Sequence, residues 1–493
     1  MNGKKLGFYT NLDSTIIAKP VYGQLILVNC TNVTVRDQIL NKASIGLFLY
    51  SCTYSVIINN TCNNNNYVGI YLDYSGNSTV ANNTCSNNQY GIWLSYSSSS
   101  TVANNTCNNN GKGIYLFSSD SLTVINNTCN NNNDGIKLYH SSSSTVTNNT
   151  CSNNNKGSGI SLLYSGGSTV TNNTCNNNNM AGILLSFSGI SNVINNTCNN
   201  NYIYGIVLFS SSSSKVSNNT FTNCGLCIGE DTIDAYISYT VENNWVNGKK
   251  LGFYTNLDSV TIAEPVYGQL ILVNCTNVTV RDQILNNASV GLFLRYCTSS
   301  VITNNTCNNN NYHGILLWYS DSSTVINNTC NNNYLDGISL GFSDSSTVTK
   351  NTCNNNQYGI ELYYSESSTV ANNTCSNNKY GICLASSDFF VFTYNLLQEN
   401  RGYGIYLESG SDNNLIHHNT FVDNNLEGSY GGSSQAYDDG INNTWYDTET
   451  QEGNYWSDCS EIGSYSIDGS AGSVDLYPLD EPTEHTTTGH IQR

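Results

Sequence analysis

The chain has 493 residues, only 11% of them charged, and its 17 basic side chains against 35 acidic ones give a net charge of −18. An acidic surface repels phosphate, so the composition argues against a nucleic-acid partner. No stretch reaches the ~20 apolar residues that a membrane-spanning helix needs, and residues 1–10 lack the basic and then apolar layout of a signal peptide. We expect neither a nucleic-acid partner nor a membrane span.

A repeat of about 23 residues runs through the chain. Each unit reads roughly G-I-x-L-x-x-S-x-x-S-T-V-x-N-N-T-C-x-N-N. Apolar residues alternate with polar ones, which predicts short strands between tight polar turns and excludes helices almost everywhere. The repeat is marked by cysteines that follow Asn-Thr, at Cys62, Cys85, Cys107, Cys129, Cys151, Cys175 and Cys198, and again at Cys307, Cys330, Cys353 and Cys375.

One such unit cannot bury its own apolar side chains, but coiling successive units at the ~4.8 Å strand spacing stacks like residues on like. The sequence therefore predicts an all-β fold, a right-handed single-stranded parallel β-helix (solenoid) of about 18–20 turns of ~23 residues. The Ile, Leu, Val and Cys positions are expected to form inward columns. We expect an aromatic column to share their inward phase, at Tyr74, Tyr96, Tyr164, Phe187, Tyr319, Phe342 and Tyr364.

The Asn pairs mark the corners of the predicted coil. Asn tolerates the left-handed backbone that a sharp corner requires, and stacked amides can form a hydrogen-bonded asparagine ladder. Many pairs also fit the glycosylation motif, but glycans at one corner of every turn would collide, so we interpret most pairs as structural. Sequons outside that column remain candidates for sugar, for example Asn29, Asn77 and Asn442.

A longer duplication overlies the short repeat. Residues 3–40 and 248–285 match at 35 of 38 positions. We divide the chain into a first β-helix array over 1–246, a continuous second array over 247–425, an acidic C-terminal cap over 426–480 and a polar tail over 481–493. Met1 stands where Val246 precedes the second copy, so we expect the natural start to lie upstream.

Several segments resemble the NosD-like right-handed β-helix proteins. They are N-G-K-K-L…V-T-V at 2–35 and 247–280, A-Y-D-D-G-I-N-N-T-W at 436–445, G-N-Y-W-S-D at 453–458 and V-D-L-Y-P-L at 474–479. The resemblance covers essentially the whole chain. It implies a fold similar to carbohydrate-binding and sugar-hydrolysis β-helix domains, common in surface or secreted proteins of archaea. The family label comes from a periplasmic protein that supports copper maturation, and the fold hosts many functions.

The acidic cap is a candidate calcium site by resemblance. Relatives often carry an Asp-rich run after G-N-Y-W-S-D, whereas this chain continues with 459–464, C-S-E-I-G-S, which puts calcium there in doubt. A cation could still bind the cap acids, although a capping turn with solvated acids is the alternative. The acids concerned are Asp438, Asp439, Asp447 and Asp458.

The 19 cysteines are an odd number, and Leu or Phe replaces them in some repeats. We therefore interpret them as buried free thiols rather than a disulfide framework. Accessible stacked sulfurs would attract copper(I), but burial argues against this. Cys224 and Cys227 form the only C-x-x-C motif, a weak metal or redox signal without a second pair.

Carbohydrate binding is the function that the outward strand positions favour. Alternation from the inward Ile and Leu places aromatic residues of neighbouring turns on one flat face, which suits stacking on sugar rings. The alternative is that aromatic residues simply favour strands. The predicted site comprises Tyr71, Asp73, Trp93, Tyr115, Phe117, Lys137 and Tyr139.

Catalytic and metal sites are less well supported by the sequence. Glu361 and Glu408 lie two turns apart, about 9.6 Å at ideal spacing, close to the separation of an inverting glycosidase. Asp321, Asp344 and Glu366 stack on a loop column and are an alternative calcium site, although a solvated acidic stripe is commoner. The six histidines form no triad by spacing.

We therefore predict a non-catalytic extracellular or cell-surface rod that binds polysaccharide or neighbouring surface proteins, without a required cofactor. One alternative is a polysaccharide lyase or glycoside hydrolase, and another is a NosD-like copper-maturation accessory protein.

Overall fold

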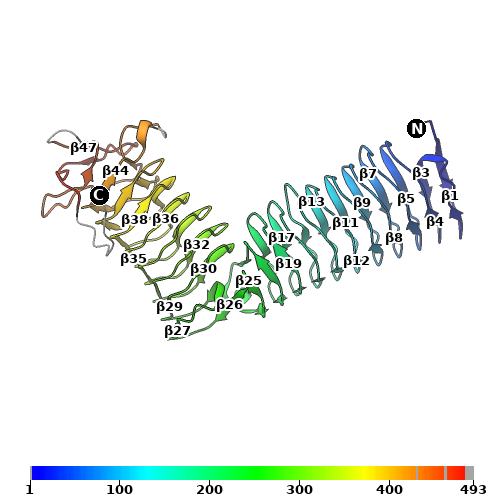
Figure 1. Cartoon of the computed structure of the whole chain (residues 1–493), viewed down its shortest axis with the longest axis horizontal. Helices are drawn as coiled ribbons and strands as arrows, with labels where there is room; N and C mark the ends of the chain where they lie inside the picture. Colours follow the sequence, from blue (N-terminus) through cyan, green and yellow to red (C-terminus); the bar gives the residue numbers. More distant parts are fainter. Residues whose placement is uncertain (1–2, 429–430, 460–462, 484–493) are drawn as a thin grey trace. The chain divides into compact units, whose positions relative to one another are not determined.

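The computed structural model describes residues 3–428, 431–459 and 463–483 (Figure 1). It confirms an all-β parallel solenoid of about 19 turns with a spacing of about 22 residues and almost no helix. The chain forms two compact units, Met1–Asn247 and Gly248–Arg493. Residues 484–493 of the predicted tail, and residues 460–462 of the segment that departs from the Asp-rich run, lie outside the described residues.

In the first unit, parallel strands of successive turns form the walls of the coil. The first wall contains β1 (Lys5–Thr10), β3 (Tyr22–Val28), β5 (Ile45–Tyr50), β7 (Val68–Asp73), β9 (Tyr90–Ser95), β11 (Lys112–Phe117), β13 (Asp134–Tyr139), β15 (Ile160–Leu163), β17 (Ala181–Ser186), β20 (Tyr204–Phe209) and β23 (Leu226–Gly229). The second wall contains β2 (Ile16–Ile17), β4 (Thr34–Arg36), β6 (Val56–Ile58), β8 (Thr79–Ala81), β10 (Thr101–Ala103), β12 (Thr123–Ile125), β14 (Thr145–Thr147), β16 (Thr169–Thr171), β18 (Asn192–Ile194), β21 (Lys215–Ser217) and β24 (Thr240–Glu242). The third wall contains β19 (Thr197–Asn199), β22 (Thr220–Thr222) and β25 (Trp245–Val246), preceded by single bridged threonines.

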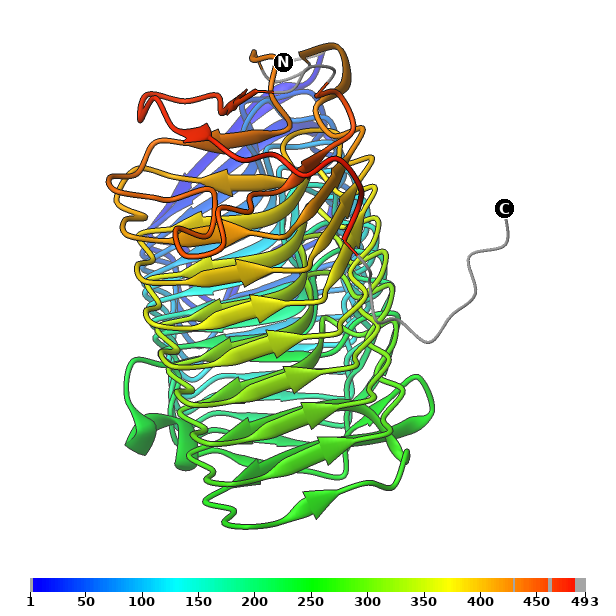
Figure 2. The same ribbon diagram turned by 90° about the vertical axis from the view of Figure 1, so that its left-hand side faces the viewer.

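The second unit repeats this plan (Figure 2). Its first wall contains β26 (Lys249–Thr255), β28 (Tyr267–Val273), β30 (Val290–Arg295), β32 (His313–Trp318), β34 (Asp336–Gly341), β36 (Tyr358–Tyr363), β39 (Tyr380–Ala385), β42 (Ile405–Leu407) and β45 (Ala436–Asp438). Its second wall contains β27 (Thr261–Ile262), β29 (Thr279–Arg281), β31 (Val301–Thr303), β33 (Thr324–Ile326), β35 (Thr347–Thr349), β37 (Thr369–Ala371), β40 (Val391–Thr393) and β43 (Leu415–His417). Its third wall contains β38 (Thr374–Ser376), β41 (Leu396–Gln398), β44 (Thr420–Val422) and β46 (Tyr455–Trp456), and β47 (Tyr465–Ser466) pairs antiparallel with β48 (Val474–Asp475).

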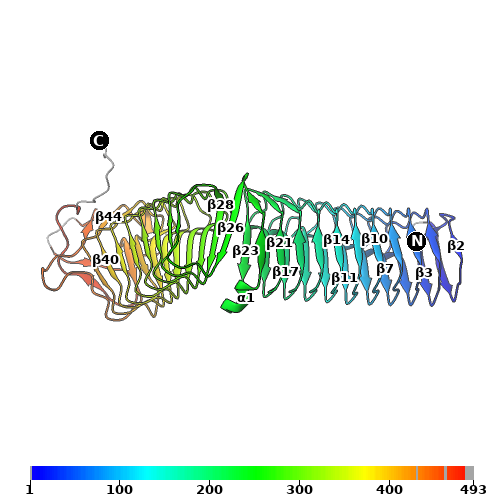
Figure 3. The same cartoon turned by 90° about the horizontal axis from the view of Figure 1, so that it is seen from below.

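Helical structure is confined to two short segments of the part of the chain that the structure describes. The helix α1 (Ile233–Ile237) projects beside β23, where Figure 3 shows it outside the coil of the first unit. Thr232 caps it by accepting a hydrogen bond from the Ala235 amide. A 3₁₀ turn, η1 (Leu426–Gly428), follows strand β44 of the third wall along the chain. No helix among the described residues is long and apolar enough to cross a membrane.

The inward columns are confirmed by burial. In one turn, Ile92, Leu94, Val102 and Cys107 are each fully buried. The glycine before each Ile is required by close packing, because a Cβ on Gly91 would lie 2.5 Å from the carbonyl oxygen of the next turn's glycine. The repeat motif G-I-x-L is therefore a packing signature of the core.

An asparagine ladder runs along each unit, as predicted. The Asn105 side-chain amide donates to Asn127 Oδ1 at 2.9 Å, and Asn351 donates to Asn373 Oδ1 at 3.0 Å in the second unit. The preceding residue of each pair, such as Asn126, is exposed with a φ of 55°. One Asn therefore turns the corner, and the other forms the ladder.

The prediction that the strand-end aromatic residues point inward is wrong. Tyr74 and Tyr96 are 51% and 47% exposed, and Phe187 is 54% exposed. Each has a φ near 50°, so it lies at a corner in left-handed conformation rather than in the strand. Strand alternation ends one residue earlier, and the corner turns these rings into solvent.

Candidate functional site

Three aromatic side chains of adjacent turns lie side by side on the outward face of the first unit. Because the flanking Ile and Leu point inward, Tyr71 on β7, Trp93 on β9 and Tyr115 on β11 share one outward register position. The ring centroids of Tyr71 and Trp93 are 4.7 Å apart, and those of Trp93 and Tyr115 are 5.7 Å apart. These predicted site residues therefore form one cluster.

The remaining predicted residues lie at the edges of this cluster. Phe117 and Tyr139 stack at the ends of β11 and β13, with centroids 5.8 Å apart. Burial raises the pKa of Asp73, and burial together with the Asp73 carboxylate raises the pKa of Tyr71 to about 12. Lys137 follows Tyr115 in register on β13.

Sequence reasoning missed part of the cluster. Tyr90 stacks against Trp93 with centroids 4.9 Å apart, and Lys112 Nζ lies 4.8 Å from the Tyr90 ring centroid. Both residues precede the glycine of the motif, a position that strict alternation counted back from Ile assigns to the core. The glycine interrupts the alternation. The signal that could have found them is the run of polar or aromatic residues at this position in three successive turns, Tyr90, Lys112 and Asp134.

A second aromatic column runs along the adjacent corner of the first unit. Tyr74 stacks on Tyr96 with centroids 4.8 Å apart, and Tyr164 stacks on Phe187 with centroids 4.9 Å apart. Ring contacts connect the whole column, in the order Tyr50, Tyr74, Tyr96, Phe117, Tyr139, His140, Tyr164 and Phe187. We call the cluster and this column together the aromatic surface.

The outward face of the second unit is different. Counted in turns from the duplicated block, Asp336, Ser339 and Glu361 occupy the positions of Tyr90, Trp93 and Tyr115. Small and acidic side chains thus replace large aromatic ones. The face is hollowed by a cavity of about 550 Å³, lined by Tyr312, His313, Leu316, Trp318, Leu335, Ser339, Phe342, Glu361 and Tyr363.

The polar floor of this cavity carries perturbed titratable groups. The His313 Nδ1 atom lies 2.7 Å from Asp336 Oδ2, and the Ser339 hydroxyl donates to Glu361 Oε2 at 3.2 Å. Burial raises the pKa of Asp336 to about 8, and burial with the Asp336 carboxylate raises the pKa of Glu361 to about 8. Burial lowers the pKa of His313 to about 4, so the imidazole is neutral at pH 7.

The two alternative catalytic residues do not share this environment. Glu361 lines the cavity, and its strand neighbours are Ser339 and Cys383, as the repeat predicted. Glu408 is exposed beyond the end of β42 and does not line the cavity. The buried partner of Glu361 is Asp336, which sequence reasoning missed because it also precedes a motif glycine.

The alternative metal column forms a ladder of its own. The Asp344 amide donates to Asp321 Oδ1 at 3.0 Å, and the Glu366 amide donates to Asp344 Oδ1 at 2.8 Å. These carboxylates thus accept hydrogen bonds from the backbone of the next turn. Among the described residues, no group of three or more His, Cys, Asp or Glu side chains is arranged to hold a metal ion.

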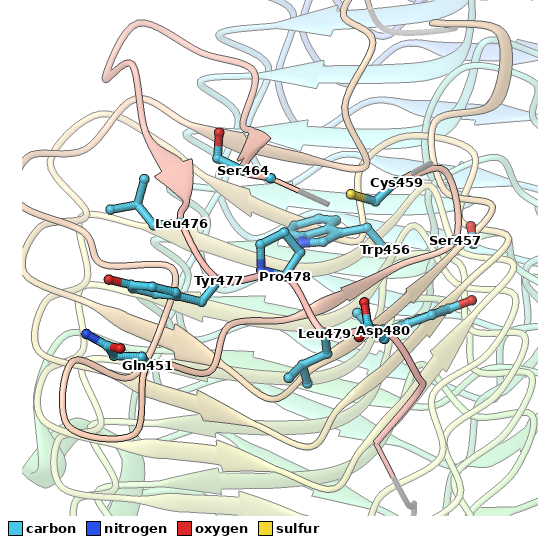
Figure 4. A pocket seen from close by; sticks show the side chains of 12 residues that line it. Gln451, Trp456, Ser457, Cys459, Ser464, Leu476, Tyr477, Pro478, Leu479 and Asp480 are labelled. Atoms are coloured by element: carbon cyan, nitrogen blue, oxygen red, sulfur yellow. The ribbon is translucent and has the colours of Figure 1, made fainter. Parts of the chain in front are cut away.

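The C-terminal cap contains a cavity of about 820 Å³ (Figure 4), lined by apolar side chains such as Trp456 and Leu479 and by polar ones such as Gln451 and Asp480. Among the candidate cation ligands of the cap, Asp438 is fully buried and accepts from the Trp445 indole at 2.9 Å. Asp439, Asp447 and Asp458 also accept hydrogen bonds within the cap. These acids stabilise the cap through hydrogen bonds. Asp438 is buried, in contrast to the solvated acids that the alternative interpretation of the sequence describes.

All 19 cysteines are free thiols, and all except Cys227 and Cys459 are buried. Cys224 extends the inward column and donates to the Cys198 carbonyl at 2.9 Å. Cys227 packs instead with Ala181, Tyr204 and Val207. The C-x-x-C cysteines therefore belong to two different packing environments.

The chain matches known protein families and solved structures. The family described as "Periplasmic copper-binding protein (NosD)" matches residues 255–461. No curated protein matches the chain in sequence. Among solved structures, the mannuronan C-5 epimerase AlgE4 A-module of Azotobacter vinelandii is 14% identical, with 72% of this chain and 91% of that chain covered and a TM-score of 0.31. The PL6 family alginate lyase AlyGC is 11% identical, with coverage of 97% and 95% and a TM-score of 0.29.

At these identities and TM-scores, the solved structures carry no conclusion about activity. The family described as "Right handed beta helix region" matches residues 9–151 and 119–264. Because these matches together span more than half of the chain, the protein belongs to the right-handed β-helix family.

Proposed function

We propose that the protein binds an uncharged polysaccharide, and that it does so without catalysis along the aromatic surface of the first unit. Exposed apolar patches of this extent mark interaction sites in soluble proteins. The edges of aromatic rings, and the apolar grooves between them, can pack on the CH groups of sugars, while phenol groups supply hydrogen bonds. The net charge of −18 disfavours polyanionic glycans.

The observation that carries this proposal is the continuity of exposed rings along the corner column. The column presents Tyr74, Tyr96, Tyr164 and Phe187, each more than 40% exposed, on successive parts of one stripe. The rings stack on one another, so a ligand would meet their edges and the grooves between them. Such a stripe suits a long chain better than a single sugar.

We place this binding outside the cytoplasm, at the cell surface or in the periplasm. The NosD family, which matches part of the second unit, is described as periplasmic. Burial of the thiols is compatible with an oxidising compartment, because buried cysteines are shielded from oxidants.

The alternatives make different predictions. A polysaccharide lyase or glycoside hydrolase would release products from a glycan, and Glu361→Gln would abolish the release. A NosD-like accessory protein would take up copper(I). A protein partner at the cell surface would compete for the same aromatic surface.

The test is retention of the purified protein on immobilised polysaccharides. We expect wild type to be retained by at least one uncharged polysaccharide, and the double variant Trp93→Ala/Tyr115→Ala or Tyr74→Ala/Tyr96→Ala to be retained at least tenfold less, since each lost ring contact costs about 0.5–1.5 kcal/mol. Tyr54→Ala is the matched control, because Tyr54 is 59% exposed in the same unit but lies outside the aromatic surface. Equal retention of all variants would refute the proposal.

A further inference from the structure

The cavity of the second unit has the size and lining of a ligand pocket. Its volume of about 550 Å³ lies within the usual 300–1,000 Å³ of small-molecule sites. Trp318 and Tyr363 form an aromatic wall, with ring centroids 6.0 Å apart. Tyr312 packs edge-on against His313 at the opening, with centroids 4.3 Å apart. Aromatic walls over a polar floor are typical of sugar pockets.

The floor and the layer beneath it contain buried polar atoms with incomplete hydrogen bonding. Neither carboxylate oxygen of Asp336 nor the Nδ1 atom of His313 makes a well-formed hydrogen bond, although Nδ1 lies 2.7 Å from Asp336 Oδ2 and the Asp336 carboxyl group interacts with Ser339 and Glu361. Asp336 is fully buried and His313 is 6% exposed. Buried polar groups with incomplete hydrogen bonding are rare. Of these two groups only His313 lines the cavity, where a ligand could complete its hydrogen bonding.

The charge state of the floor indicates which ligand fits. At pH 7 the burial of Asp336 and Glu361 favours their protonated forms, and His313 is neutral. Hydroxyl and carboxylic acid groups in this state both donate and accept hydrogen bonds. No Lys or Arg is among the described side chains that line the cavity. The Arg295 guanidinium lies 5.9 Å from the Trp318 ring centroid but is packed over the Tyr296 and Tyr319 rings, so the lining itself offers a sugar carboxylate no counter-charge.

We propose that this cavity binds one residue of an uncharged saccharide, with Glu361 and Ser339 hydrogen-bonded to its hydroxyls and Trp318 and Tyr363 packed against its ring. The inference deepens the proposed function, since it assigns a second site for the same ligand class on a different unit. The site binds and does not cleave, because Asp336 is buried behind Glu361 and the cavity presents one carboxyl group. A glycosidase needs two carboxyl groups on either side of the bond.

Binding to this site should depend on pH through Glu361. The titratable groups around it are His313, Asp336, Tyr358, Tyr363, Cys383 and Glu408. Deprotonation places a negative charge on the floor and removes a donor. With a pKa of about 8, the protonated fraction of Glu361 falls about tenfold between pH 7 and pH 9.

The experiment is calorimetric titration of the whole protein with soluble gluco-, manno-, galacto- and chito-oligosaccharides, and with oligogalacturonate as the anionic counterpart, at pH 7 and pH 9. We expect binding of at least one uncharged oligosaccharide at pH 7, about tenfold weaker at pH 9, and no binding of oligogalacturonate. Glu361→Gln keeps an uncharged donor in place, so its affinity should decline less between pH 7 and pH 9 than that of wild type; Asp336, with a pKa also raised to about 8, accounts for any remaining decline.

Two further variants separate the cavity from the aromatic surface. Ser339→Trp introduces the residue that the first unit carries at this position, and it should fill the cavity and reduce affinity at least tenfold. Trp318→Ala should do the same by removing a wall. Tyr394→Ala, 40% exposed elsewhere in the second unit, is the control and should bind as wild type.

The outcomes distinguish this site from the aromatic surface. Binding that survives Ser339→Trp and Trp318→Ala, or binding by no uncharged oligosaccharide at all, would overturn the cavity proposal. The same holds if Glu361→Gln keeps the wild-type decline with pH. If Trp93→Ala/Tyr115→Ala abolishes polysaccharide retention while oligosaccharide titration is unchanged, both proposals stand. If retention is unchanged and titration follows the cavity variants, only the aromatic surface fails.

Discussion

The two units start from nearly the same 38-residue block and carry the same inward columns, yet their outward faces differ. The first unit presents Trp93 and Tyr115, which pack against their neighbours. The hollow beside them, lined by residues that include Tyr90 and Lys112, has a volume of about 180 Å³. The second unit presents Ser339 and Glu361 at the same positions and opens a cavity. In this fold, the core determines register, and single outward residues determine what each face can bind.

This difference is possible because inward and outward positions are energetically separate. An inward Ile packs against the Ile of the turn above and of the turn below, so its replacement disturbs the packing of three turns. An outward residue contacts only its neighbours on the face. The duplicated coil therefore tolerates a change from an aromatic face to an acidic pocket without a change in register.

The largest effect on stability should come from breaking the asparagine ladder, which both units contain. Asn127→Ala in the first unit, and Asn351→Ala in the second, each remove the ladder bonds above and below and leave buried partners unpaired. We expect each to lower the free energy of unfolding by about 3–6 kcal/mol, measured by urea denaturation.

The control for the ladder is Asn126→Gly, which changes an exposed corner residue with a φ of 55°. Glycine accepts this conformation, so little loss is expected. A similar loss for Asn126→Gly and Asn127→Ala would show that the corner, and not the ladder, stabilises the coil.

An effect of intermediate size on stability should come from the two buried carboxyl groups of the second unit, which have no counterpart in the first unit's Tyr90 and Tyr115. The pKa values of Asp336 and Glu361 are raised to about 8 in the folded chain from ordinary values near 4, so the folded state holds protons that the unfolded chain releases. The free energy of unfolding should therefore fall as pH rises from about 4 to above 8, by at least about 1.4 kcal/mol, the equivalent of one pKa unit.

Differential scanning calorimetry at pH 5 and pH 9 measures this loss as a lower Tm. The double variant Asp336→Asn/Glu361→Gln removes both protons and should make the pH dependence flatter. If the decline in Tm persists unchanged in the double variant, these carboxyl groups do not titrate as the structure indicates.

The smallest effect concerns the aromatic surface. Lys112 Nζ lies 4.8 Å from the Tyr90 ring centroid and 5.0 Å from that of Tyr115. Lys112→Met keeps the aliphatic stem and should lower the free energy of unfolding by about 0.5–1 kcal/mol through lost cation–π attraction. Lys156→Met, an exposed lysine of the same unit, is the control and should leave stability unchanged.

The fold was predictable because every inward position repeats. Ile92 and Cys107 belong to columns that recur at one spacing, and period-two alternation allows few other architectures. The strand-face residues Tyr71, Trp93 and Tyr115 were predictable for the same reason.

The rest depends on local exceptions to alternation. Tyr74 lies one residue beyond the strand, where a positive φ turns it outward. His313 and Asp336 precede a glycine, where alternation is interrupted. They occupy the same register position of the adjacent strands β32 and β34, so the repeat stacks them, but the pattern alone does not show that the two side chains are buried against each other. Counting turns from the duplicated block would have aligned Asp336 with Tyr90 and drawn attention to the face.

The cysteine column constrains the order of folding and thiol oxidation. The buried thiols are shielded only while the coil is closed, and within each array the cysteines that follow Asn-Thr lie 22–24 residues apart. In an oxidising compartment, oxidation of an opened chain would join cysteines of different turns into disulfides, and those between non-adjacent turns would hold strands out of register. Unfolding should then be irreversible without a reductant, and maturation has to close the coil before oxidation reaches it.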